Sequence, residues 1–207
     1  MKRLLLVVFL VCFLAGTAAA EDMNSVRKNA ESGDPEAQCK IAREFVNIRY
    51  NYDFDKIPKW LDIDEKIIAG WLKKLAENGN PEAQYLLARA YIEELTEDND
   101  DDDKKKMSLL QKAAEQNHNE AQFELGTYYK DGYGGDGRKD PELALKWLTK
   151  AAENGNKDAP YFIGLMYYEG GDVAKDYSKA AEWLKKSNDD RAKKLLDEIK
   201  KSTSKKK

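Results

Sequence analysis

The sequence of 207 residues contains few of the residue types from which disulfide frameworks, metal centres and many active sites are built. It has two cysteines and one histidine, His118. Cys12 lies in the apolar N-terminal segment, so Cys39 has no partner for an intramolecular disulfide once that segment is removed. A general base or a metal ligand needs partner side chains, and the sequence offers His118 no second histidine, no cysteine pair and no HExxH motif. We therefore predict no catalytic residue, no metal site and no cofactor, and we expect His118 to be an exposed turn residue.

An excess of positive charge and a long apolar run are also absent. The 35 basic and 38 acidic residues leave a net charge of −3, which argues against a nucleic-acid partner. Lys2 and Arg3 precede an apolar run over residues 4–14, and small residues follow up to Ala20, as in a secretory signal peptide. The run of 11 residues is shorter than the roughly 20 of a spanning helix, and no later segment approaches that length. We expect cleavage after Ala20 and no membrane span in the mature chain. Cleavage removes Lys2 and Arg3, so the mature net charge is −5. We expect export, to the periplasm if the source is Gram-negative and into the medium otherwise.

What the chain does contain is an internal repeat. The stretch "AENGNPEAQYLLARAY" returns as "AENGNKDAPYFIGLMYY", with the looser copy "AEQNHNEAQFELGTYY" between them. The apolar residues that precede these three copies, together with the corresponding residue of the last unit, are separated by 38, 38 and 36 positions, a period typical of helical solenoids. These aligned residues are Trp71, Leu109, Trp147 and Trp183.

Each repeat unit is predicted to form two helices. In one copy the first helix places Ala121, Leu125, Gly126 and Tyr129 on one face, and the second helix carries an apolar stripe over residues 144–152. Neither helix can bury its stripe alone, so the units must stack on one another. Gly126 and Gly164 are expected where a neighbouring helix approaches closely, and the residues expected to end helices in the left-handed conformation are Gly33, Gly79, Gly155 and, in the middle copy, Asn117.

The unit "AQFELGTYYKDGYGGDGRKDPELALKWLTKAAENGN", from Ala121 to Asn156, resembles the Sel-1-like repeat family, which is related to the tetratricopeptide repeats, and "APYFIGLMYYEGGDVAKDYSKAAEWLKKSN" resembles it too. The resemblance implies an all-α fold, a right-handed α-solenoid built as a superhelix of antiparallel helix pairs. It also implies a role in holding other proteins, and it supplies no common catalytic residue. We expect a signal peptide at 1–20, a solenoid of about four repeats at 21–190, and a capping helix with a basic tail at 191–207.

Two segments depart from the repeat, an insertion at 46–66 and an acidic and basic loop at 97–106. The insertion contains four aromatic residues in "YNYDFDKIPKW", which either cover the N-terminal end of the stack or contact a partner. The loop contains the run Asp98 to Asp103, but Asp103 and Leu109 stand where an EF-hand needs Gly and Glu. A solvated loop is therefore favoured over a calcium site. Cys39 falls at a packing position, which favours an inert buried thiol over a reactive or intermolecular one.

The positions that the copies do not share form a stripe on the first helix of each unit, opposite the packing face. Because first helices line the groove in tetratricopeptide-like stacks, the resemblance implies that this stripe binds a protein or peptide, and aromatic and Met side chains are typical anchors. The alternative is that these side chains pack beneath the loops. The candidate partner-binding residues are Leu86, Glu124, Tyr128, Phe162 and Met166.

The function that we expect is that of an exported, non-enzymatic scaffold for protein–protein interaction. One alternative is a periplasmic immunity or inhibitor protein against a toxin, since small exported members of the family are found beside toxin genes. A second alternative is an enzyme of cell-wall or β-lactam chemistry, since cysteine-rich relatives are described in those terms. Those relatives have disulfide-paired repeats, and the chain does not have the cysteines for such pairs.

Overall fold

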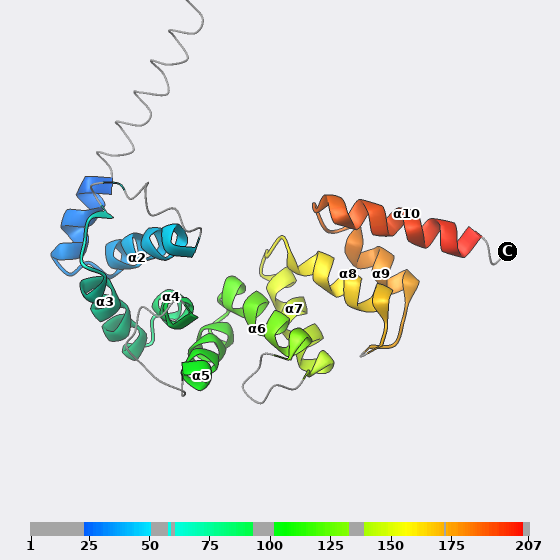
Figure 1. Cartoon of the computed structure of the whole chain (residues 1–207), viewed down its shortest axis with the longest axis horizontal. Coiled ribbons are helices and arrows are strands. Elements are labelled where there is room, and N and C mark those ends of the chain that lie inside the picture. Colours follow the sequence, from blue (N-terminus) through cyan, green and yellow to red (C-terminus); the bar gives the residue numbers. More distant parts are fainter. Residues whose placement is uncertain are drawn as a thin grey trace, which may run out of the picture. The chain divides into compact units, whose positions relative to one another are not determined.

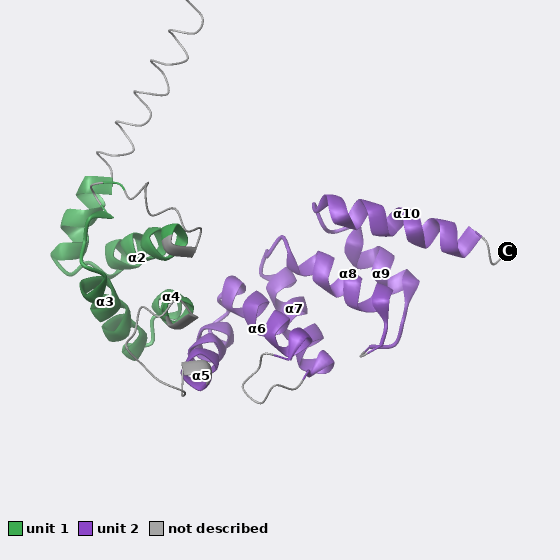
Figure 2. Cartoon of the chain, in the orientation of Figure 1, with its two compact units in different colours: residues 1–98 green, residues 99–207 purple. Residues whose placement is uncertain are grey.

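The structure is a computed structural model that describes residues 23–50, 58, 61–92, 102–132, 139–171 and 173–204 (Figure 1). Every regular element within these ranges is a helix, so the expected all-α fold is confirmed. The chain divides into two compact units, residues 1–98 and residues 99–207 (Figure 2).

The first unit contains a helix at residues 23–31, α2 (Pro35–Tyr50), α3 (Glu65–Glu77) and α4 (Pro81–Ile92). Two of these helices begin with proline, which lacks the N–H that the first turn of a helix leaves unbonded. The guanidinium of Arg43 in α2 forms two hydrogen bonds, of 2.8 and 2.5 Å, with the carboxylate of Glu82 in α4. These contacts place α2 and α4 side by side.

The second unit contains six helices in the described ranges. Helices α6 and α7 form one pair, and α8 and α9 form a second. Helix α5 precedes the first pair, and α10 follows the second. The helices are α5 (Asp102–Glu115), α6 (Asn119–Asp131), α7 (Pro141–Glu153), α8 (Ala159–Glu169), α9 (Tyr177–Leu184) and α10 (Asp190–Ser204).

Hydrogen bonds at both ends of the α6–α7 pair show that the two helices are antiparallel. The backbone N–H of Asp140, just before α7, donates to the carbonyl of Tyr129 near the end of α6 at 2.9 Å. At the other end, the side chain of Asn154 after α7 donates to Gln122 near the start of α6 at 2.8 Å. The start of each helix therefore lies beside the end of the other.

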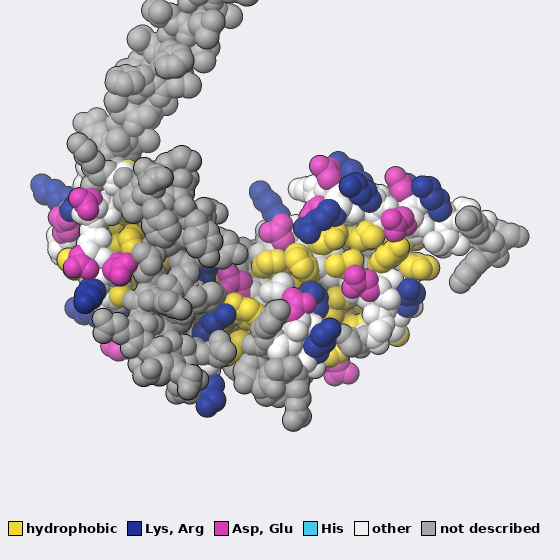
Figure 3. Space-filling view, viewed as in Figure 1, with side chains coloured by type: hydrophobic (Ala, Val, Ile, Leu, Met, Phe, Trp, Pro, Cys, Tyr) yellow, Lys and Arg dark blue, Asp and Glu magenta, His cyan; other side chains and the backbone are white. Residues whose placement is uncertain are grey.

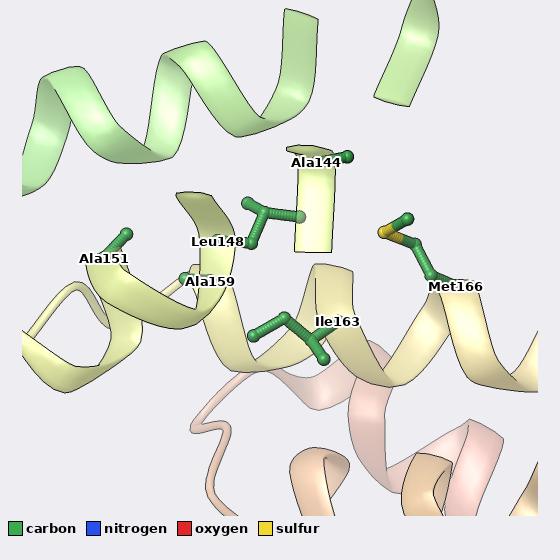
Figure 4. Close-up of a cluster of buried hydrophobic side chains, with 6 residues drawn as sticks. All are labelled: Ala144, Leu148, Ala151, Ala159, Ile163 and Met166. Carbon is green, nitrogen blue, oxygen red and sulfur yellow. The ribbon is translucent and has the colours of Figure 1, made fainter. Parts of the chain in front are cut away.

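Glycine allows the two helices of a pair to approach closely, as the sequence predicts. A Cβ added at Gly126 would lie 2.7 Å from Cγ of Leu148, and one added at Gly164 would lie 2.6 Å from Cγ of Leu184. The leucine side chains occupy the space that any larger residue would need. The buried cluster around Leu148 also includes Ala144, Ala151, Ala159, Ile163 and Met166, which come from α7 and α8 (Figure 4).

The turns that end the helices have the predicted left-handed backbone. Gly155 has φ of 91°, and Asn117, the residue expected to replace glycine in the middle copy, has φ of 64°. Asparagine tolerates this conformation better than most residues because its short side chain can hydrogen-bond locally. The chain can therefore reverse after α5 without glycine.

The terminal helix α10 packs on α8 and α9. Its Ala192 and Ile199 are buried against the last repeat, and its opposite face is charged. Glu198 accepts a 2.5 Å hydrogen bond from the hydroxyl of Tyr168 in α8, which raises the pKa of Tyr168 to about 12. The side chains of the four aromatic residues of the 46–66 insertion, the side chains of the Asp98–Asp103 run and the last three residues of the basic tail lie outside what the structure describes.

Candidate protein-interaction site

The five candidate partner-binding residues differ in their accessibility. Leu86 is fully buried in the first unit, and Met166 is 6% exposed and belongs to the core cluster shared by α7 and α8. Neither side chain can contact a partner in this conformation, so their placement on an open stripe is corrected. The stripe was inferred from helical spacing, which does not show how far neighbouring helices cover it. Glu124, Tyr128 and Phe162 are half-buried in the second unit.

Aromatic rings from neighbouring repeats meet at Phe162. Its ring packs edge-on against Phe123 of α6, with centroids 5.3 Å apart, and against Tyr161 with centroids 5.5 Å apart. Edge-to-face pairs of this kind contribute about 0.5–1.5 kcal/mol beyond the area that they bury. Because both phenylalanines are half-buried, part of each ring is left for contact with another molecule.

Lysine side chains lie over aromatic rings of α6 and α8. Lys106 Nζ lies 4.3 Å from the ring centroid of Tyr128, and Lys130 Nζ lies 5.9 Å from that of Phe162. These cation–π contacts add positive charge beside exposed ring surface. We call the surface formed by Phe123 and Phe162 the α6–α8 aromatic face. Tyr128 lies beside Lys106 of α5 and leaves α6 about 140° away from Phe123, so it is not part of this face. In the second unit, hydrophobic side chains gather between α8 and α10 and are bordered by charged residues (Figure 3).

His118 is not the exposed turn residue that the sequence predicts. Its side chain is 9% exposed, and its Nδ1 accepts a 3.3 Å hydrogen bond from the N–H of Ala121 at the start of α6. Asn80 and Asn156 bind the corresponding N–H groups of their own units at 2.9 and 3.0 Å. His118 is therefore a helix cap, because its ring nitrogen takes the place of the asparagine oxygen.

Buried glutamines form a set of contacts that sequence reasoning did not single out. The amides of Gln38, Gln84 and Gln122 each donate to a carbonyl eight residues earlier, at 3.0, 3.2 and 2.9 Å. Gln122 has no exposed surface, and its oxygen also accepts from Asn154. A polar residue at the same repeat position in successive copies was the available signal, since a buried amide must find partners.

Cys39 is buried, as predicted. Burial, reinforced by the charge of Glu82 and opposed by that of Arg43, raises the pKa of the Cys39 thiol to about 11. A thiol with such a pKa carries little of the reactive thiolate at neutral pH. These properties fit a packing role.

The described residues also bear on metal and membrane binding. Within the described ranges, no group of three or more His, Cys, Asp or Glu side chains is placed to hold a metal ion. None of the helices in the described part of the chain has both the length and the apolar character that a membrane crossing requires.

Comparison with known proteins relates the repeats to a family. The model of the Sel1 repeat matches residues 81–118, 119–156 and 158–190, which together make up more than half of the chain. The second and third matches contain the pairs α6–α7 and α8–α9. The helix pair α2–α3 lies outside the three matches.

Solved structures share this fold. A protective antigen present in uropathogenic Escherichia coli strains, described as displaying an SLR fold, is 29% identical, with a TM-score of 0.58 over 79% of this chain and 32% of that one. A Sel1 repeat protein from Oxalobacter formigenes is 25% identical, with a TM-score of 0.64 over 86% of this chain and 49% of that one. A sel1 repeat protein from Klebsiella pneumoniae subsp. pneumoniae, 21% identical, shares the fold alone, with a TM-score of 0.54 over 91% of this chain and 88% of that one.

The chain therefore spans about a third of the Escherichia coli protein and about half of the Oxalobacter formigenes protein. None of the curated proteins compared with it matches. The matched repeats, the glycine-mediated packing of their helix pairs and the shared fold lead to one conclusion: the chain belongs to the Sel1 repeat family.

Proposed function

We propose that the chain is an exported, non-enzymatic scaffold that binds a protein or peptide on the α6–α8 aromatic face. Sel1 repeat proteins generally bind other proteins. The observation that carries the proposal is the contact of Phe123 with Phe162, two half-buried rings from neighbouring repeats, 5.3 Å apart. Aromatic side chains held on a rigid scaffold are typical anchors of protein interfaces, because they bury a large area at a small cost in conformational entropy.

The test is a pull-down from envelope and culture extracts, read by mass spectrometry. The wild-type chain is compared with the double variant Phe123→Ser, Phe162→Ser, which leaves Met166 in the core. The matched control is Ile67→Ser, which removes an apolar side chain that is 49% exposed on α3. We expect a protein that the wild type and the control retain and the double variant loses.

Circular dichroism decides whether the double variant is still folded. If it keeps its helicity and its partner, the aromatic face is not the binding surface. A failure to retain any specific protein with the wild type would contradict the scaffold function itself.

Export is part of the proposal and rests on the residue pattern of positions 1–20. We expect the protein recovered from outside the cytoplasm to begin at Glu21, which intact-mass analysis measures directly. A chain that keeps Met1 and stays in the cytoplasm would contradict export and would leave the binding proposal standing.

A further inference from the structure

The last repeat lacks the glutamine that the earlier repeats bury. Pro160 follows Ala159 at the position where Gln122 follows Ala121. The amide of Gln122 donates to the carbonyl of Ala114, and its backbone N–H donates to the carbonyl of His118 at 3.0 Å. Proline has no side-chain amide and no N–H, so it can form neither bond. The space beside Ala152, the counterpart of Ala114, is left without a glutamine side chain.

The second helix of the last repeat is also shorter. Both α7 and α9 begin at the same distance before their tryptophans, Trp147 and Trp183, but α7 has 13 residues and α9 has eight. The end of α7 supplies Asn154, which binds Gln122. Since α9 ends at Leu184, the last repeat lacks the turns that fill this region in the preceding copy.

The two departures from the repeat leave a hollow of about 480 Å³ between the α7–α8 turn and α9. This volume lies within the roughly 300–1,000 Å³ range of ligand pockets. Trp183 lines it and is half-buried, whereas its counterpart Trp147 is 7% exposed. The apolar part of the lining comes from Ala152, Pro160 and Trp183.

The polar part of the lining carries a net positive charge. Lys157 and Lys186 line the hollow together with one carboxylate, that of Glu153. Lys186 Nζ lies 4.1 Å from the ring centroid of Trp183. Among the residues that the structure describes, neither lysine forms an ion pair. Thr149 and Asn188 add a hydroxyl and an amide, which can bond to a peptide backbone.

We propose that this hollow binds an acidic segment of a partner polypeptide. An aromatic or aliphatic side chain of that segment occupies the space beside Trp183, and neighbouring Asp or Glu side chains bind Lys157 and Lys186. Charge complementarity selects this occupant, because two lysines beside a partly accessible indole favour a carboxylate next to an apolar group. A basic segment would bring like charges together.

The hollow is separate from the α6–α8 aromatic face. Pro160 and Phe162 are two residues apart on α8, and two residues correspond to about 200° around a helix axis. Their side chains therefore leave the helix in nearly opposite directions. The two sites can be removed one at a time.

The test begins with selection of a displayed library of random heptapeptides on the full chain. We expect the selected peptides to combine Asp or Glu with an aromatic or aliphatic residue. The affinity of one selected peptide is then measured by fluorescence polarisation. Pro160→Gln restores the residue of the other repeats and fills the hollow, so we expect it to weaken binding at least tenfold, as should the double variant Lys157→Glu, Lys186→Glu.

The charge control is Lys201→Glu, an exposed lysine on α10 that does not line the hollow; it should change the affinity less than twofold. Thermal unfolding checks that each variant is folded. The proposal is overturned if no peptide is enriched, if the enriched peptides have no acidic bias, or if Pro160→Gln leaves the affinity unchanged. Loss of binding in Phe162→Ser with retention in Pro160→Gln would assign the peptide to the aromatic face and would also overturn it.

Discussion

Replacement of Gly126 by alanine tests how tightly the repeats are packed. In an open helix this change stabilises a protein by about 1 kcal/mol, because alanine loses less conformational entropy than glycine. At Gly126 the new methyl group would lie 2.7 Å from Cγ of Leu148 and 3.0 Å from its backbone nitrogen. Overpacking of a core costs roughly 1–3 kcal/mol, and subtracting the gain of about 1 kcal/mol leaves an expected net loss of about 0–2 kcal/mol.

Gly70 in α3 provides the matched control. Nothing lies within 4 Å of a Cβ added there, so Gly70→Ala should stabilise its unit by about 0.5–1 kcal/mol. Urea unfolding followed by far-UV circular dichroism measures both variants against the wild type, with an unchanged denaturant slope as the check on the comparison. If Gly126→Ala is as stabilising as Gly70→Ala, the close approach of α6 and α7 is not what requires glycine.

A double-mutant cycle locates the clash. Leu148 is fully buried, and Leu148→Ala alone should cost about 2–5 kcal/mol. In the Gly126→Ala background the same change also removes the clashing atoms, so its cost should be smaller. Additive costs would show that the two residues do not interact.

The remaining predictions concern the polar contacts, the left-handed turn and the buried thiol. Gln122→Ala should destabilise the chain by about 1–3 kcal/mol. This loss should exceed that of Gln38→Ala, because Gln122 binds both Ala114 and Asn154. Urea unfolding measures the two variants, and equal losses would contradict the double role of Gln122. Asn117→Gly should stabilise by roughly 0.5–1 kcal/mol in the same assay, since glycine adopts a φ of 64° without strain, and a loss would show that the asparagine side chain is needed. The pKa of Cys39 is raised to about 11 from an ordinary 9.0, so the native state holds this proton more tightly than the unfolded chain does. The free energy of unfolding should therefore fall between about pH 9 and 11, and it should fall by less in Cys39→Ala. Parallel pH profiles of the two proteins would refute the shift.

The sequence predicts how the repeats pack because the residues at packing positions recur at fixed intervals along the chain. The apolar stripe of α7, the close-approach positions Gly126 and Gly164 and the left-handed Asn117 all lie where the pattern places them. The stripe and the turn depend on residues that are near one another in sequence, and the two glycines stand at the same position of successive copies. Helical spacing and turn chemistry are therefore sufficient to identify them.

The candidate site is predicted less well because exposure depends on what covers a helix. The same spacing that identifies Tyr128 and Phe162 also selects Leu86 and Met166, which the fold buries. The hollow at Pro160 arises from a residue that departs from the repeat and from the early end of α9. Neither has a functional signature of its own, and only the structure shows that they adjoin the same space.

The hydrogen bonds of Gln122 also couple the local unfolding of the helices that this side chain joins. This side chain joins the end of α5 to the end of α7, so local unfolding of either end exposes a buried amide that has lost a partner. At Pro160 no such side chain joins the end of α7 to α9. The helices α8 to α10 can therefore open as a cooperative unit at a lower free energy than α5 to α7, and their amide protons should exchange with solvent first.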